Sequence, residues 1–462
     1  MDNRISAFFA SVKGKTVAFC GIGGSNLPLI RMFADKGAIV TARDRRSAEA
    51  LGETAVLLSN LGVKLVLGDA YLSDLTEDII FRTPGMKYGL PELTAARAHG
   101  AVVTSEMEVF FDLCPCKIYA VTGSDGKTTT TSIIAELLRA AGKTVHLGGN
   151  IGRPLLPDIE TIAPDDVAVV ELSSFQLISM RKSPDVAVVT NLSPNHLDVH
   201  GSMEEYIDAK KNILAHQGAF SRTVLNADNA ITRGFADSVR GERMFFSRLE
   251  PCAYGVFLRA DGWIVHAPSG TEILRAEEIK IPGLHNIENY LAAIAAVWGT
   301  VSPEIIRSVA RTFGGVPHRA ELVRVLDGVS YYNDSIGTSP TRTIRGTLSL
   351  YPEKIILIAG GYDKKIPFDP LGPAVVEHVK LLILMGATAP KIEAAVKAAA
   401  GYRDGNPAIL HAASMEEAVS LAHQHAQTGD VVSLSPACAS FDLYPNFEAR
   451  GNHFKQLVQA LS

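Results

Sequence analysis

Several features that define other classes of protein are scarce in this sequence. The chain of 462 residues contains only five cysteines and two tryptophans. A small and odd number of cysteines argues against a disulfide framework and fits a reduced, cytosolic setting. Lys and Arg total 44 against 49 Asp and Glu, so the net charge of −5 provides no basic excess for binding nucleic acid.

Long apolar runs are also missing. Stretches such as IILIAGG and LLILMG are far shorter than the roughly 18–20 residues that span a bilayer. The N-terminal MDNRISAFFASVKGK lacks the cationic start and the cleavage site of a secretory signal. We therefore predict a cytoplasmic protein with no membrane span. Cys114 and Cys116 form a C-x-C pair with no second pair nearby, a pattern that does not favour zinc.

Short apolar runs alternate with amphipathic helical stretches along most of the chain. This pattern is typical of α/β proteins with parallel sheets, and the length suggests several domains. Breaks fall at 114–117, before a new strand-like run, and at 313–318, where glycines and a proline interrupt a helical pattern. We predict three domains, at 1–114, 115–315 and 316–462, with a hinge at the second break.

The strongest local motif is Gly123-Ser-Asp-Gly-Lys-Thr128, which follows the strand-like run 117–121 and precedes a helical stretch. Such a loop directs backbone N–H groups at phosphate oxygens, while Lys127 neutralises charge and the Thr128 hydroxyl can bind Mg²⁺. The spacing departs from the strict P-loop, because Val121 stands where a glycine is expected. The strand–loop–helix context still predicts a nucleoside triphosphate.

A second glycine-rich turn contains Gly21 and Gly23, and Asp44 lies about twenty residues further on. This spacing is similar to a dinucleotide fingerprint, although Asn26 replaces the last glycine. Three interpretations stay open: an ordinary β-α turn, a site for a nucleotide or nucleotide sugar, and an NAD(P) site. Asp44 could accept ribose hydroxyls, and Arg45 or Arg46 could contact phosphate.

Polar residues follow other strand-like runs. Glu171 is suited to bind Mg²⁺, and His196 to bind a metal or to orient a neighbouring group. Ser173 could instead cap a helix. Lys210 shares a helix face with Tyr206, and its spacing alone does not distinguish it from a surface lysine. In the last third, hydroxyl-rich loops at strand ends indicate a further binding face.

Ordered strings along essentially the whole chain resemble the Mur ligases of peptidoglycan synthesis. They are GSDGKTTT at 123–130, GGNIGRPLL at 148–156, ELSSFQL at 171–177, NLSPNHLDVHGSMEEYIDAK at 191–210, GLHNIENYLAA at 283–293, GVPHR at 315–319, NDS at 333–335 and LSPACASFDLYPNFEARGNHF at 434–454. ELSSFQL and SPACAS are similar to the members that add D-glutamate. The DNPR string of the diaminopimelate-adding members is absent.

The resemblance implies an N-terminal Rossmann-like domain that binds UDP, a central P-loop ATPase-like domain with a mostly parallel sheet, and a C-terminal Rossmann-like domain that binds an amino acid. It implies an ATP-dependent ligase that forms an acyl phosphate on UDP-N-acetylmuramoyl-L-alanine and couples it to D-glutamate. The implied cofactors are ATP and Mg²⁺, with two ions, and the implied state is a monomer.

Site residues follow from the same resemblance, position by position. For ATP it implies Gly123, Ser124, Asp125, Gly126, Lys127, Thr128, Thr129, Asn286, Asn289, Arg319 and Asp334. For the UDP-linked substrate it implies Gly23, Gly24, Ser25, Asn26, Asp44, Arg45, Thr83, Pro84, Gly85, Asn150, Ser173 and Gln176. For the amino acid it implies Lys364, Ser440, Phe441 and Phe447. The implied catalytic residues are Lys127, Glu171, His196 and Lys210, and the implied metal ligands are Thr128, Glu171, His196 and Lys210 as a carbamate.

One position departs from the family pattern. Ile336 stands where many members carry a lysine that pairs with the amino-acid substrate, so Lys364 would have to supply that charge alone. A Mur-type or folylpolyglutamate-type ligase with another amino-acid substrate is therefore the main alternative. An oxidoreductase or redox-sensing module built on the N-terminal glycine-rich turn is a second one, and it predicts nicotinamide binding without ATP turnover.

Overall fold

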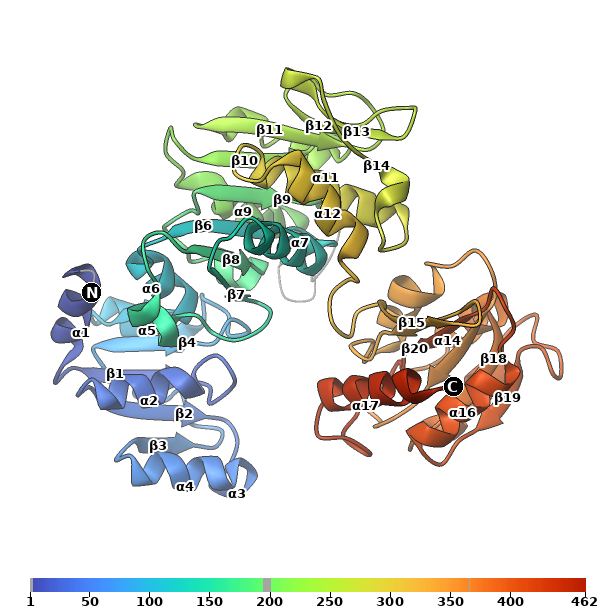
Figure 1. The fold of residues 1–462 in the computed structure, drawn as a ribbon. Coiled ribbons are helices and arrows are strands. Elements are labelled where there is room, and N and C mark those ends of the chain that lie inside the picture. The colour runs from blue at the N-terminus through green and yellow to red at the C-terminus, as the bar shows by residue number, and fades with distance from the viewer. Residues whose placement is uncertain (1–2, 194–200, 365) are drawn as a thin grey trace. The chain divides into compact units, whose positions relative to one another are not determined.

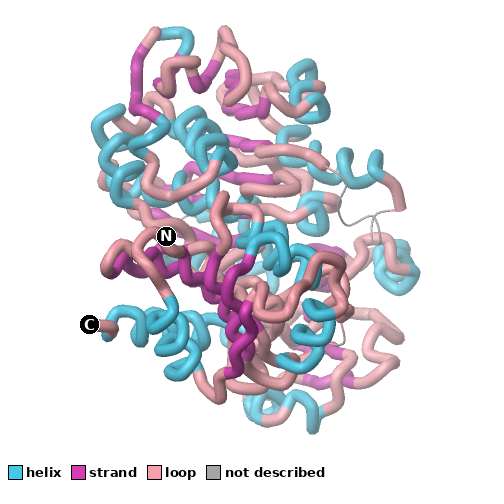
Figure 2. Tube along the Cα trace, turned by 90° about the vertical axis from the view of Figure 1, so that its right-hand side faces the viewer, coloured by secondary structure: helices cyan, strands magenta, loops and turns pink. Residues whose placement is uncertain are grey.

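The computed structural model describes residues 3–193, 201–364 and 366–462 (Figure 1). Its strands form three separate sheets, and Figure 2 shows helices around the strands, as predicted for an α/β chain. The chain divides into two compact units, Met1–Ile279 with Leu284–Arg311, and Lys280–Gly283 with Thr312–Ser462. The first unit holds two of the sheets and the second unit holds the third. Within the described ranges, no helix is long and apolar enough to cross a membrane.

The N-terminal sheet has five parallel strands in the order β3-β2-β1-β4-β5. Its strands are β1 (Thr16–Cys20), β2 (Ile39–Asp44), β3 (Lys64–Leu67), β4 (Ile79–Arg82) and β5 (Val102–Thr104). Its helices are α1 (Asn3–Val12), α2 (Leu27–Asp35), α3 (Ala48–Leu51), α4 (Glu53–Asn60), α5 (Pro91–Ala98) and α6 (Glu106–Leu113). The predicted strand at 16–20 is confirmed residue for residue. Strand order reverses between β1 and β4, and ligands of open α/β sheets bind at such a point.

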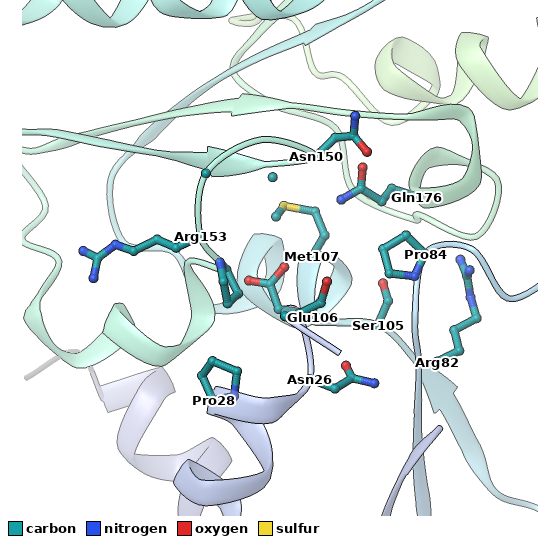
Figure 3. Close-up of a pocket in the computed structure, with 15 residues that line it drawn as sticks. Asn26, Pro28, Arg82, Pro84, Ser105, Glu106, Met107, Asn150, Arg153 and Gln176 are labelled. Carbon is teal, nitrogen blue, oxygen red and sulfur yellow. The ribbon is translucent and has the colours of Figure 1, made fainter. Parts of the chain in front are cut away.

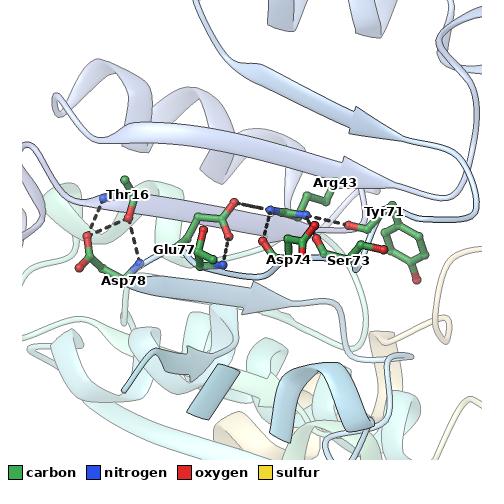
Figure 4. Close-up of polar contacts among 8 residues, drawn as sticks. Thr16, Arg43, Tyr71, Ser73, Asp74, Glu77 and Asp78 are labelled. Carbon is green, nitrogen blue, oxygen red and sulfur yellow. Dashed lines mark hydrogen bonds and ion pairs between the residues drawn. The ribbon is translucent and has the colours of Figure 1, made fainter. Parts of the chain in front are cut away.

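A buried ion pair fixes the long connection between β3 and β4. Arg43 Nη2 lies 2.8 Å from Glu77 Oε1, and the same guanidinium donates to the carbonyl oxygens of Tyr71, Ser73 and Asp74 (Figure 4). A buried charge is tolerated when it is paired and its remaining donors are hydrogen-bonded. The connection therefore has a defined course beside the carboxyl end of β2.

The central sheet has nine strands in the order β14-β13-β12-β11-β10-β9-β6-β8-β7. Its strands are β6 (Lys117–Thr122), β7 (Val145–Gly149), β8 (Val167–Glu171), β9 (Val186–Val189), β10 (Arg222–Asn226), β11 (Glu242–Ser247), β12 (Gly255–Leu258), β13 (Trp263–His266) and β14 (Thr271–Arg275). Its helices are α7 (Lys127–Ala140), α8 (Ser174–Leu177), α9 (Met203–Ala215), α10 (Ala230–Arg233), α11 (Leu284–Val297) and α12 (Pro303–Thr312). Only β12-β13-β14 pair antiparallel, so the sheet is mostly parallel, as predicted. Figure 1 shows α7, α11 and α12 on one face of it.

The local sequence explains these elements. Strands β8 and β9 are apolar almost throughout because helices cover both faces of a parallel sheet. Helix α6 begins after Ser105, and α9 begins after Ser202; each serine accepts a hydrogen bond from the amide of the third helical residue. These caps fix where both helices begin.

The second unit contains a sheet of six strands in the order β15-β16-β20-β17-β18-β19. Its strands are β15 (Glu321–Leu326), β16 (Val329–Asn333), β17 (Ile355–Ala359), β18 (Val379–Leu384), β19 (Ala408–His411) and β20 (Val431–Leu434). Its helices are α13 (Pro340–Thr343), α14 (Leu371–His378), α15 (Ala389–Lys397), α16 (Met415–His425) and α17 (Phe447–Ala460). Apart from the β15-β16 hairpin all pairs are parallel. The predicted strands at 321–326 and 431–434 are confirmed.

Candidate active site

The predicted phosphate loop connects β6 to α7 and requires two glycines. Gly123 and Gly126 have φ of +151° and +77°. A Cβ on Gly123 would lie 1.9 Å from Thr190 Oγ1, and a Cβ on Gly126 would lie 2.4 Å from Asn289 Oδ1. Both positions therefore need a residue without a side chain, for backbone conformation and for space.

The segment after β9 holds this loop in place. Thr190 Oγ1 donates to the carbonyl oxygen of Asp125 at 2.6 Å, and the amide of Ser124 donates to the carbonyl oxygen of Asn191 at 2.8 Å. Lys127 folds back over the loop, where its Nζ donates to the carbonyl oxygen of Ser124 at 3.0 Å. Contacts within the protein thus hold the loop in its conformation, with its cation beside the helix N-terminus.

Glu171, at the end of β8, connects the phosphate loop to a second loop. Its Oε2 accepts a hydrogen bond from Thr128 Oγ1, and its Oε1 accepts one from Asn150 Nδ2, both at 2.7 Å. Glu171 is only 2% exposed. Three residues predicted for ATP, metal and the UDP-linked substrate therefore lie in direct contact.

Lys210 lies inside the molecule rather than on its surface. Its Nζ donates to Thr122 Oγ1 at 3.0 Å and to the carbonyl oxygen of Gly123 at 2.9 Å. Burial, reinforced by the neighbouring charge of Lys127 and only partly opposed by Glu171, holds the pKa of Lys210 well below its ordinary value. The structure thus brings Lys210 against the phosphate loop, which local spacing could not indicate.

Asn286 and Asn289, which were also predicted for ATP, both lie on α11. Asn289 Oδ1 accepts a hydrogen bond from Thr130 Oγ1 at 3.1 Å, and Asn289 Nδ2 donates to Asn286 Oδ1 at 3.0 Å, so α11 contacts the start of α7. Thr129 is buried in α7. The prediction for His196 lies outside the described residues.

A cavity of about 470 Å³ lies in the first unit, between the N-terminal and central sheets. It is lined by Gly24, Ser25, Asn26, Pro28, Arg82, Pro84, Ser105, Glu106, Met107, Gly149, Asn150, Gly152, Arg153, Pro154 and Gln176. Figure 3 shows Asn150 and Gln176 on one wall and Asn26 and Pro28 on the opposite wall. Six residues predicted for the UDP-linked substrate are among the lining residues. Sequence reasoning missed Arg82, Ser105 and Glu106, which belong to no motif, and Arg153, which lies within the string at 148–156 but was given no role.

The other residues predicted for this substrate are Gly23, Asp44, Arg45, Thr83, Gly85 and Ser173, and they do not line the cavity. Asp44 Oδ2 accepts from the amide of Ile22 at 2.7 Å and from Arg46 Nη2 at 2.8 Å. Arg45 is exposed and pairs with Asp69. Ser173 caps α8 by accepting a hydrogen bond from the amide of Gln176. Asp44 therefore holds the glycine-rich turn in this structure.

In the second unit, the remaining predicted residues lie at the ends of β16, β17 and β20 and the start of α17. Asp334 is buried and accepts hydrogen bonds from Ser435 Oγ at 2.7 Å and Thr347 Oγ1 at 2.8 Å; burial outweighs these bonds and raises its pKa. Lys364 Nζ donates to the carbonyl oxygen of Thr338 at 3.2 Å. Ser440 is buried, whereas Phe441 is 64% exposed.

Arg319 and Phe447 flank a strained turn in the same unit. His318, next to Arg319, has φ of +63°, and its ring meets that of Phe447 edge to face at 5.9 Å. The amide of Arg319 donates to the carbonyl oxygen of Val316 at 3.0 Å. A strained backbone of this kind is retained where surrounding contacts determine it.

The pair Cys114 and Cys116 forms no larger ligand set. Their sulfur atoms lie 3.5 Å apart and are buried. Across the residues that the structure describes, no group of three or more His, Cys, Asp and Glu side chains is arranged to hold a metal.

Fold, phosphate loop and sequence together define the class of this protein: the chain belongs to the Mur ligase family. Residues 121–297 match the Mur ligase middle domain, and residues 318–438 match the Mur ligase glutamate ligase domain. The chain is 52% identical over 465 residues to the UDP-N-acetylmuramoylalanine–D-glutamate ligase of Acetivibrio thermocellus, with 100% of both chains covered. It is 53% identical over 451 residues to the enzyme of that name from Symbiobacterium thermophilum, covering 96% of this chain and 98% of the relative.

Solved structures agree on the fold. The UDP-N-acetylmuramate-alanine ligase of Thermotoga maritima superposes with a TM-score of 0.58 at 18% identity, covering 96% of this chain and 99% of that one. A pseudomurein peptide ligase type C from Methanothermus fervidus gives 0.53 at 19% identity, covering 97% and 100%. The predicted α/β fold with a mostly parallel central sheet is thereby confirmed.

Proposed function

We propose that this protein is an ATP-dependent ligase that adds D-glutamate to UDP-N-acetylmuramoyl-L-alanine in peptidoglycan precursor synthesis. Relatives that carry this activity in their name are about half identical to it over nearly their whole length. The observation that carries the proposal is the double contact of Glu171 with Thr128 of the phosphate loop and Asn150 of the cavity wall. A triphosphate on that loop would have its reacting end beside a ligand in the cavity.

The reaction has two steps. A carboxylate oxygen of the L-alanine end attacks the γ-phosphorus of ATP, the bond to the β-phosphate oxygen breaks, and ADP leaves. The amine nitrogen of D-glutamate then attacks the carbonyl carbon of the acyl phosphate. Phosphate departs with the C–O bonding electrons, and the nitrogen loses a proton, which leaves an amide.

The main barrier to the first step is the approach of two anions. Lys127 and the N-terminus of α7 provide positive charge in a preformed position, which stabilises charge as it develops. Asn150 would hold the acceptor end of the UDP-linked substrate next to Glu171. We propose Lys127, Glu171, His196 and Lys210 as the catalytic residues.

The donor set fits Mg²⁺, because the Thr128 hydroxyl and the Glu171 carboxylate are hard oxygen ligands in contact with each other. When bound, Mg²⁺ neutralises phosphate charge between the reacting groups. We propose two ions, the second held by His196 and by a carbamate on Lys210. A lowered pKa increases the fraction of Lys210 that is a neutral amine, the form that reacts with CO₂, and the carbamate would add anionic oxygens.

We also propose how the chain is organised. Residues 1–114 would bind the UDP group, 115–315 ATP, and 316–462 D-glutamate through Lys364, Ser440, Phe441 and Phe447. Arg319 and Asp334 would contribute to the ATP site, with Asp334 acting through the groups it holds. We propose a monomer that works in the cytoplasm.

Phosphate release by the purified protein tests this function. With UDP-N-acetylmuramoyl-L-alanine, ATP and Mg²⁺ present, D-glutamate should trigger stoichiometric ADP and phosphate formation, and omission of Mg²⁺ should abolish it. A panel of other amino acids separates this function from a Mur-type or folylpolyglutamate-type ligase of different specificity, which Ile336 keeps as an alternative. Turnover with another amino acid but not with D-glutamate would contradict the proposal.

A further inference from the structure

Arg82 is a buried cation that makes no hydrogen bond to a carboxylate among the described residues, although the negative charge of Glu108 acts on it. It ends β4 and is 1% exposed. Burial lowers its pKa. Burial of a guanidinium is costly unless hydrogen bonds satisfy its donors. The hydrogen bonds of Arg82 therefore identify the segments that it holds together.

The hydrogen bonds of Arg82 join two segments that are distant in sequence. Nη1 donates to the carbonyl oxygen of Met86 at 3.1 Å, while Nη2 donates to the carbonyl oxygen of Phe175 at 3.0 Å and to Ser179 Oγ at 2.6 Å. Met86 closes the turn that begins at Thr83, since its amide donates to the Thr83 carbonyl oxygen. Arg82 thus fixes the turn after β4 against α8.

The same network extends to the start of α6. The Ser179 hydroxyl also interacts with Glu108, whose Oε2 accepts from Ser105 Oγ at 2.7 Å. Glu106, which follows Ser105 in the sequence, accepts hydrogen bonds from the amides of Leu155 and Leu156 at 2.8 and 2.9 Å. The start of α6 therefore connects the turn after β4, α8 and the loop that carries Asn150.

These segments form the cavity wall. Arg82, Pro84, Ser105, Glu106, Asn150 and Gln176 all line it, and Figure 3 places Arg82 and Pro84 together at one end and Arg153 at the other. Arg82 Nε is buried without a hydrogen-bond partner in the described part of the chain. Its terminal nitrogens are occupied by the protein, so the side chain acts on a ligand through the segments that it holds.

We propose that Arg82 is a positioning residue for the nucleotide-sugar substrate, an inference that rests on the proposed function. It locks the turn after β4 onto α8, so that the cavity has its binding shape before the substrate arrives. Preorganisation of this kind increases affinity because less ordering is needed on binding. Loss of Arg82 should therefore weaken binding of the UDP-linked substrate. It should not change the phosphate loop, because that loop is held by the segment after β9.

Calorimetric titration with UDP-N-acetylmuramoyl-L-alanine and, separately, with a non-hydrolysable ATP analogue tests this. Arg82→Met should weaken binding of the nucleotide sugar by about 10- to 100-fold, as expected for the loss of bonds from a charged donor. Affinity for the ATP analogue should stay within about twofold. Arg82→Lys, which keeps one donor group and the charge, should recover part of the loss.

Arg97→Met is the matched control. Arg97 also bonds a carbonyl oxygen in the loop after β4, that of Tyr88 at 3.1 Å, but it does not line the cavity. The Arg97→Met variant should bind the nucleotide sugar and the ATP analogue with wild-type affinity. If Arg82→Met binds the nucleotide sugar like the wild type, or loses both ligands equally, the positioning role is overturned.

Ser179→Ala keeps the inference testable if Arg82→Met does not fold. It removes one acceptor of Arg82 and should weaken nucleotide-sugar binding by about three- to tenfold without affecting the ATP analogue; unchanged binding would overturn the proposal. These titrations require no turnover. A wild type that binds the nucleotide sugar but does not ligate D-glutamate contradicts the proposed function alone, whereas a wild type that does not bind it contradicts both.

Discussion

Lys210 Nζ donates to the carbonyl oxygen of Gly123 at 2.9 Å, so this side chain from α9 reaches the first residue of the phosphate loop. The amine is buried and has a lowered pKa, chiefly because burial disfavours its charged form. Burial therefore shifts the equilibrium of Lys210 towards the neutral amine, which is the form able to react with CO₂.

We predict that Lys210→Ala lowers the rate of phosphate release by at least about a hundredfold, because the carbamate would supply charge-bearing oxygens at the metal site. Millimolar acetate or formate should restore part of the activity by replacing those oxygens. The assay is D-glutamate-dependent phosphate release, with and without added carboxylate.

Lys211→Ala is the control for this variant, since Lys211 is adjacent on α9 and lies over the ring of Phe235. It should retain wild-type activity. Full activity of Lys210→Ala, or rescue that fails at every carboxylate concentration while the protein stays folded, would contradict the carbamate.

The glycines that flank α7 provide a second prediction. Gly126→Ala should weaken ATP binding strongly, because its Cβ would lie 2.4 Å from Asn289 Oδ1 and its φ is +77°. Gly142, at the other end of the helix, has a similar φ of +82° with open space around its Cβ position. Gly142→Ala should therefore cost only about 1 kcal/mol of stability.

Comparison of the two alanine variants separates backbone strain from loop distortion. Thermal unfolding measures stability, and titration with an ATP analogue measures the loop. Equal ATP affinity in both variants would mean that the contact with Asn289 does not shape the phosphate loop.

Much of the fold was predictable because its signals are local. The strand at 16–20 and the loop at 123–128 follow from apolar runs ending in glycine-rich turns, and the structure confirms the strand boundaries. The role proposed for Lys210 came only from the family resemblance, because its contacts with Thr122 and Gly123 join positions far apart in the sequence.

Arg82 shows the limit of reasoning from spacing. It stands at the end of a strand with no motif around it, and its partners Phe175 and Ser179 are more than ninety positions away. Asp44 shows a related limit: its position was predicted, but its hydrogen bonds to Ile22 and Arg46 depend on how the turn folds. The contacts of Arg82 are set by packing between the N-terminal and central sheets, and those of Asp44 by the course of the glycine-rich turn.

The amino-acid side offers a third prediction. Lys364→Met should raise the KM for D-glutamate by about tenfold or more, because Ile336 supplies no second cation for a dicarboxylate. The KM values for ATP and the UDP-linked substrate should change little. Lys391→Met is the control, since Lys391 Nζ is already paired with Asp363 Oδ2 at 2.5 Å. An unchanged KM for D-glutamate in Lys364→Met would remove Lys364 from the site.

The last prediction concerns pH and Asp44. Burial alone would raise the pKa of Asp44, but hydrogen bonds from Arg46 and Ile22 outweigh it and lower the pKa from 3.8 to about 2. A carboxyl group whose pKa is lowered by folding stabilises the folded state above its unfolded pKa, and this contribution is lost as pH falls through the folded pKa. Because Arg46 is half exposed, solvent reduces the contribution to about 1 kcal/mol.

Asp44→Asn removes this titration. The urea midpoint of the wild type should exceed that of Asp44→Asn by a constant amount between pH 5 and pH 7, and the excess should shrink as pH falls from about 4 towards 2. Subtracting the two urea midpoints at each pH cancels the contributions of the carboxyl groups that both proteins share. A difference that stays constant down to pH 2.5 would show that the Asp44 carboxylate does not stabilise the glycine-rich turn through its charge.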